Sequence, residues 1–178
     1  MRKVLFLVAI VSVTAYAQQS VNLKDTLLWM HNFVADNGSQ FVGQRNPDNG
    51  SCELGTPNCE QRHDVSTFDS QGCSATVKWL VTLNYKDIGA HTYQFSLKDL
   101  DPKSVAVVKD KPFQNAVLVE TTNSEKKVTE SFIMPGSKTE ESKHTWVELV
   151  FDSEDSAKRF AKALKHAVQL CGGKPSAF

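Results

Sequence analysis

Apolar and polar side chains alternate over residues 73–85, which read Cys-Ser-Ala-Thr-Val-Lys-Trp-Leu-Val-Thr-Leu-Asn-Tyr. This alternation has the two-residue period of a β-strand that buries one face. The apolar face carries Ala75, Val77, Trp79, Val81 and Leu83. A single strand cannot bury such a face alone, so the stretch predicts a sheet packed against another layer.

Shorter runs of the same kind follow, separated by turn residues such as Asp99-Leu100-Asp101-Pro102 and Pro135-Gly136. We expect Lys86-Asp87-Ile88-Gly89 to form the first hairpin turn. The expected strands are a short one near 65–68 and longer ones at 73–85, 91–98, 105–109, 115–122, 126–134 and 145–151. Such a succession of strands and turns predicts an antiparallel meander.

An amphipathic helix is expected on each side of these strands. In residues 22–35, apolar side chains recur at spacings of three and four behind an Asn22 N-cap. The second helix begins at Asp152-Ser153-Glu154-Asp155, an acidic start that suits the positive end of a helix dipole. Its apolar face carries Ala157, Phe160, Ala161, Leu164, Val168 and Cys171, and Gly172-Gly173 ends it.

The intervening residues 38–63 are rich in Gly, Pro and Asn, and we expect a long irregular segment there. Within it lie Cys52 and Cys59, which could staple the segment with a local disulfide.

The 178 residues carry 20 Lys+Arg and 20 Asp+Glu, so the formal net charge is zero. This balance excludes a basic nucleic-acid binder, and the 40% apolar content excludes a disordered chain. A chain of this size can bury one self-sufficient core, and we expect a single main domain.

The N-terminus has the pattern of a secretory signal peptide. Arg2 and Lys3 precede the uncharged apolar residues 4–13, and Ala15-Tyr16-Ala17 forms a cleavage site. The apolar run is shorter than the roughly 20 residues that span a bilayer. We expect residues 1–17 to be removed, which leaves 178 − 17 = 161 residues. The protein is then exported to the periplasm or the exterior, with no integral membrane segment after cleavage.

Export predicts that the four cysteines form disulfides. Three pairings are possible, and we favour Cys52–Cys59 and Cys73–Cys171. The second would close the folded domain on itself. A metal site at Cys52, Cys59 and His63 is the alternative, but these spacings match no zinc-finger or zinc-ribbon pattern.

The domain organisation follows from these elements. Residues 1–17 form the signal peptide, 18–63 the N-terminal helix and stapled loop, 64–173 the main domain and 174–178 a tail.

The strand order with its final helix resembles the pleckstrin-homology-like (PH-like) barrel. Residues 96–108 and 151–174 look like those of uncharacterised exported bacterial proteins of this build. The resemblance covers about 64–173 and implies an α+β fold. It implies an antiparallel six- or seven-stranded barrel or sandwich, capped by the C-terminal helix, with an extra N-terminal helix. Helix-grip and lipocalin-like folds are alternatives. Inositide binding is disfavoured, because the first hairpin loop holds only one basic residue, Lys86.

The sequence contains no Gly-x-Ser-x-Gly, His-Glu-x-x-His or phosphate-loop motif. The histidines, at positions 31, 63, 91, 144 and 166, are scattered along the chain. Asp99 and Asp101 could act as paired carboxylates, but turn chemistry beside Pro102 is the better interpretation. We therefore expect no catalytic residues, no metal and no cofactor.

A basic set on the second helix, Lys158, Arg159, Lys162 and Lys165, suits a solvated face or an acidic partner. The sequence favours an exported, non-enzymatic binding or protein-interaction module whose partner is an unknown protein or a small apolar ligand. The alternative is a small-molecule or lipid carrier with a cavity between sheet and C-terminal helix. The residues that could line such a cavity are Trp79, Tyr93, Phe95, Phe132 and Trp146.

Overall fold

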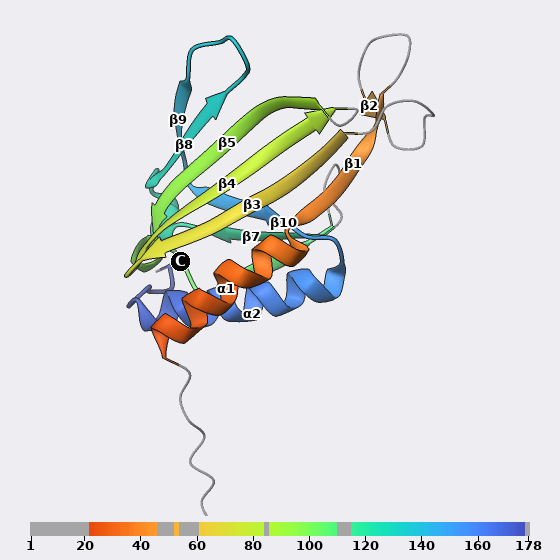
Figure 1. Cartoon of the computed structure of the whole chain (residues 1–178). Helices are drawn as coiled ribbons and strands as arrows, with labels where there is room; N and C mark the ends of the chain where they lie inside the picture. The colour runs from red at the N-terminus through yellow and green to blue at the C-terminus, as the bar shows by residue number, and fades with distance from the viewer. Residues whose placement is uncertain (1–21, 46–51, 54–60, 84–85, 110–114, 177–178) are drawn as a thin grey trace, which may run out of the picture.

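The computed structural model describes residues 22–45, 52–53, 61–83, 86–109 and 115–176 (Figure 1). It shows an α+β fold with antiparallel sheets, one helix at the start of the described chain and one near its end. The helices are α1 (Leu23–Asn37) and α2 (Glu154–Leu170), with short 3-10 helices η1 (Leu97–Asp99) and η2 (Thr122–Ser124). The strands are β1 (Ser39–Arg45), β2 (Cys52–Glu53), β3 (Gln61–Gln71), β4 (Ser74–Leu83), β5 (Lys86–Ser96), β6 (Ala106–Val108), β7 (Ala116–Glu120), β8 (Val128–Ile133), β9 (Glu140–His144) and β10 (Trp146–Val150).

The described strands form two sheets. The larger has the order β2-β1-β3-β4-β5-β8-β9, and the smaller has the order β10-β7-β6. The alternating stretch is the central strand β4, which pairs with β3 on one side and β5 on the other. Its apolar residues Ala75, Val77 and Trp79 are buried, as the period of two predicts.

Of the two expected forms, a barrel or a sandwich, the described strands do not close into a barrel, and they are more numerous than the six or seven expected. The simple meander is also wrong for the described residues. At η2 the chain leaves the smaller sheet through Asn123 and Ser124, whose φ angles of 58° and 53° are left-handed. The next strand, β8, then pairs with β5 of the larger sheet. Sequential strands are thus divided between two sheets, which remain separate in their strand order.

Three local expectations also need correction. Part of the supposedly irregular segment is β1, which pairs with β3. The strongly polar residues 140–144 form edge strand β9, because pairing with β8 supplies its hydrogen bonds. Residues 86–89 belong to β5 and are not a turn. In each case, pairing with a neighbouring strand overrides local composition.

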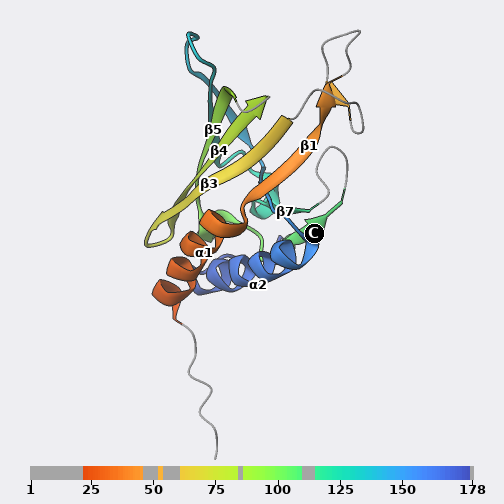
Figure 2. The same ribbon diagram turned by 45° about the vertical axis from the view of Figure 1, so that its right-hand side comes forward.

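The two long helices lie side by side beneath the sheets (Figure 2). Phe160 of α2 is fully buried, with its ring centroid 5.8 Å from that of Phe68 on β3 and 4.9 Å from that of Phe151. Phe33 of α1 joins this group, 6.5 Å from Phe160. One aromatic core therefore holds both helices against the strands.

The helix ends follow the expected capping chemistry. The Asn22 side chain accepts from the Asp25 N–H at 2.9 Å, and Ser153 accepts from Ser156 N–H at 3.2 Å. After α2, Gly172 has a φ of 82°, which suits a helix stop.

The structure joins Cys73 and Cys171 in a disulfide, the pairing that the sequence analysis favours, with Cα atoms 5.7 Å apart. The other expected pair, Cys52–Cys59, cannot be described, because the side chain of Cys52 and the whole of Cys59 lie outside the described residues, as does the signal peptide. None of the described helices has the length and apolar character needed to span a bilayer.

Candidate functional site

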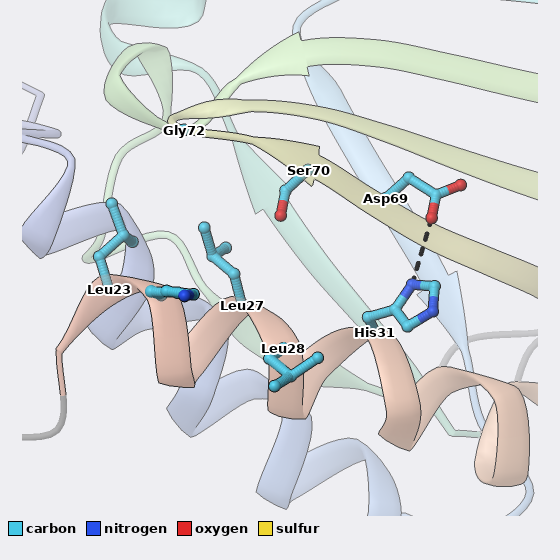
Figure 3. Close-up of a pocket in the computed structure, with 8 residues that line it drawn as sticks. Leu23, Leu27, Leu28, His31, Asp69, Ser70 and Gly72 are labelled. Atoms are coloured by element: carbon cyan, nitrogen blue, oxygen red, sulfur yellow. Dashed lines mark ion pairs between the residues drawn. The ribbon is translucent and has the colours of Figure 1, made fainter.

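A hollow of about 550 Å³ lies between α1 and the end of β3, and we call it the α1–β3 hollow (Figure 3). It is lined by Leu23, Lys24, Leu27, Leu28, His31, Asp69, Ser70 and Gly72. Leu23 and Leu27 rise from α1 toward Ser70 on β3. The hollow therefore has an apolar floor and a polar edge.

The helical period explains this floor. Leu23 and Leu27 are one turn apart on α1. Leu27 is 7% exposed, whereas its neighbour Leu28 turns outward and is 57% exposed. Leu28 is the most exposed large apolar side chain among the described residues. On the opposite side, Gly72 has a φ of 59°, the left-handed conformation that lets β3 turn sharply into β4.

The polar edge is a histidine–carboxylate pair. Nδ1 of His31 is 3.0 Å from the Phe68 carbonyl oxygen and 3.2 Å from Oδ1 of Asp69. Because a carbonyl only accepts, Nδ1 carries the proton and donates to it. Both side chains are about half exposed, so the pair orients the ring more than it stabilises the fold.

A second group of polar side chains, here called the glutamate cluster, lies on β5, β8 and β9. It consists of His91, Tyr93, Glu130, Ser142 and His144. The Glu130 carboxylate is 2.5 Å from His91 Nδ1 through one oxygen and 2.5 Å from His144 Nε2 through the other. The sequence showed these residues only as scattered, because their proximity depends on the strand pairing.

The carboxylate of Glu130 is held in its charged form. Burial alone would raise the pKa of Glu130, but hydrogen bonds from His91 and Tyr93 lower it below the usual range. Burial and the same carboxylate raise the pKa of Tyr93 well above its usual value, so the phenol stays protonated and can donate.

The arrangement does not match a nucleophile relay. Ser142 Oγ is 2.8 Å from His144 Nε2, the same nitrogen that contacts Glu130. In a relay, the carboxylate must hold the other ring nitrogen, so that Nε2 is left to take the proton from the hydroxyl. The glutamate cluster instead connects β5, β8 and β9 through contacts between their side chains.

The basic set of α2 divides into two groups. Lys158 pairs with Glu154 at 2.8 Å, and Lys109 contacts the same carboxylate at 2.7 Å. Arg159 and Lys162 instead line a groove between α1 and α2. All four basic side chains are exposed, as a solvated face requires, and two of them, Arg159 and Lys162, also border the groove.

The paired aspartates have structural roles. Asp101 is buried and accepts from the N–H groups of Lys103 at 2.7 Å and Ser176 at 2.8 Å. Burial alone would raise the pKa of Asp101, but these N–H groups lower it. Asp99 contacts Lys127 at 3.4 Å. Both therefore organise the turn and the chain end.

The aromatic residues considered for a cavity are mostly core. Trp79, Tyr93 and Phe95 are buried, while Phe132 and Trp146 are only partly so. Over the described ranges, no group of three or more His, Cys, Asp and Glu side chains is arranged to hold a metal ion. The side chains of Cys52, Cys59 and His63 lie outside the described residues.

No family model matches this chain, and no curated protein matches it.

Proposed function

We propose that this protein is an exported, non-enzymatic interaction module that docks a protein partner at the α1–β3 hollow. The observation that carries the proposal is the exposed Leu28 beside an apolar hollow of about 550 Å³. An apolar centre with a polar rim is the usual anatomy of a protein interface. A partner side chain would fill the hollow, and Leu28 would be covered at its edge.

Export is part of the proposal. The N-terminal pattern of residues 1–17 supports it. The Cys73–Cys171 disulfide is compatible with an oxidising compartment.

A binding role is preferred to catalysis for geometric reasons. His144 uses one nitrogen for both of its polar partners, so it cannot relay a proton to Ser142. His31 has an orienting carboxylate, Asp69, but its contacts include no serine or cysteine nucleophile among the described residues.

The carrier alternative has less support. The α2 side chains that face the sheet, including Phe160, Leu164 and Val168, are fully buried in the core. A cavity between sheet and helix would need these side chains to move.

The kinship with PH-like barrels is likewise a proposal. Its support is the combination of two antiparallel sheets with a C-terminal helix packed on the core. If a PH-like protein is a relative of this chain, the strands that correspond to β5 and β8 should also pair with each other in it.

Native mass spectrometry of the mature protein, purified from its own exported fraction, tests the docking proposal. We expect wild-type protein to carry a non-covalent protein partner that Leu28→Glu loses. Ile133→Glu is the matched control, because Ile133 is also exposed but lies on β8. A bare wild-type chain, or equal loss of the partner from both variants, would contradict the proposal.

A further inference from the structure

A second hollow lies on the other side of α1, in the groove between α1 and α2. Its volume is about 790 Å³. Trp29 and Ala163 supply apolar surface, and Arg159, Lys162 and His166 form one wall. Asp25 lies on the opposite wall. The groove is thus apolar in its floor and basic along α2.

The basic wall follows from helical spacing. Arg159, Lys162 and His166 are at positions i, i+3 and i+7, which share one face of a helix. The row extends over about 10 Å, given a rise of about 1.5 Å per residue. The adjacent residue Lys158 does not line the groove, and its ammonium pairs instead with Glu154, one turn nearer the start of α2.

The Arg159 guanidinium is already held in place. It lies 5.9 Å from the centroid of the Trp29 ring and 4.9 Å from that of Phe33. These two rings stack on each other with centroids 4.4 Å apart. A guanidinium stacked through its face keeps its N–H edge available for a planar anion.

The two cations of the wall have no carboxylate partner in the described parts of the chain. Arg159 and Lys162 form none of the ion pairs found there. Across the groove, the Asp25 carboxylate accepts from the Asn22 side-chain amide at 2.8 Å. The charges of Arg159 and Lys162 are therefore open to an anion from outside.

We propose that this groove binds a free amphipathic carboxylate, an alkyl-chain acid. Its carboxylate group lies against Arg159 and Lys162, and its chain lies over Trp29 and Ala163. The volume falls within the range of about 300–1,000 Å³ that is typical of small-molecule sites. Arg binds carboxylates with two parallel hydrogen bonds, and the aromatic floor buries methylene groups. This site goes beyond the protein-docking role, because it lies on the opposite side of α1.

Trp29 provides a direct reporter for this site. With the full mature chain, its disulfides intact, 12-bromododecanoate should quench the fluorescence of Trp29. Trp79 is buried in the sheet, and Trp146 lies in β10. Trp29→Phe should abolish most of the quenching, because it removes the indole that lines the groove.

Charge variants on α2 test the wall. We expect Arg159→Gln to weaken dodecanoate binding about tenfold or more, and Lys162→Gln to weaken it less. Lys158→Gln, which removes the same charge from a side chain that pairs with Glu154 and does not line the groove, should stay within about twofold of wild type. Circular dichroism checks that each variant is folded.

Chain length and headgroup give the remaining outcomes. Each added methylene from octanoate to dodecanoate should strengthen binding about two- to fourfold. The inference is overturned if dodecanol binds as well as dodecanoate, or if Lys158→Gln weakens binding as much as Arg159→Gln. It is equally overturned if the protein binds phosphatidylglycerol vesicles or an acidic peptide but no free carboxylate. A protein partner lost on Leu28→Glu, without carboxylate binding, would overturn this inference and leave the docking proposal standing.

Discussion

The Cα atoms of Cys73 and Cys171 lie 5.7 Å apart, although 98 residues separate them in the chain. Cys73 stands in the turn between β3 and β4, and Cys171 caps the C-terminal end of α2. The disulfide therefore connects the turn between two neighbouring strands of the larger sheet to the end of the last helix.

Replacing both cysteines should reveal the contribution of this closure. We expect Cys73→Ser/Cys171→Ser to lower the free energy of unfolding by about 2–5 kcal/mol, because the long loop regains its freedom in the unfolded chain. Urea unfolding under non-reducing conditions measures this loss of unfolding free energy. A loss below about 1 kcal/mol would show that the core alone holds α2 in place.

Phe160 is the side chain of α2 that contacts the most aromatic neighbours. It packs against Phe33, Phe68 and Phe151. Phe160→Ala should cost about 3–5 kcal/mol in unfolding free energy, through lost apolar burial and the cavity left behind. Lys165→Ala, an exposed change on the same helix, should stay within about 0.5 kcal/mol of wild type in the same urea titration. Similar values for both would contradict the packing described.

The glutamate cluster predicts a pH dependence of stability. Because the folded-state pKa of Glu130 is lowered, its carboxylate contributes stability that is fully present above the unfolded pKa. That contribution is lost as the pH falls through the folded pKa. We expect Glu130→Gln to lower the free energy of unfolding by about 1.5–3 kcal/mol at pH 7. The difference from wild type should shrink below about pH 4.

Glu148 offers a control of opposite sign. Burial raises the pKa of Glu148, so its charge costs folding free energy at neutral pH. Glu148→Gln should therefore leave stability at pH 7 unchanged or slightly higher. Chemical unfolding at pH 7 and pH 3 compares the two variants, and equal losses at both sites would contradict the assignment.

Gly38 lies between the end of α1 and the start of β1. We expect any side chain at this position to lower the stability of the fold. A Cβ atom there would lie 2.7 Å from the carbonyl oxygens of both Val34 and Val65. Gly38→Ala must therefore push β3 away from α1, and we expect a loss of about 1–3 kcal/mol. A thermal melt measures this loss. Leu28→Ala, at an exposed position of the same helix, serves as the comparison.

The sequence predicts those helices and strands whose apolar side chains recur at a regular spacing. The cap at Asn22, the apolar face of α2 and the alternation of β4 all describe local chemistry that the structure keeps. Strand β9 was missed because an exposed edge strand has no apolar face to produce a pattern. Its pairing with β8 depends on contacts that the local sequence does not encode.

The candidate sites were less predictable for the same reason. Arg159 and Trp29 are 130 residues apart (159 − 29), and only the packing of α2 on α1 brings them together. The hollow beside Leu28 forms where α1 crosses the end of β3, so helical periodicity alone does not indicate it.

Site-specific photo-crosslinking at position 28 tests the central claim most directly. A benzophenone side chain would replace Leu28 in one variant and Ile133, which is also exposed, in another. Both variants would be irradiated in cells that export the protein. We expect one discrete protein adduct from position 28, none from position 133, and loss of the adduct when Leu23→Glu adds a charge to the hollow. The same adducts from both positions, or none from position 28, would contradict the central claim.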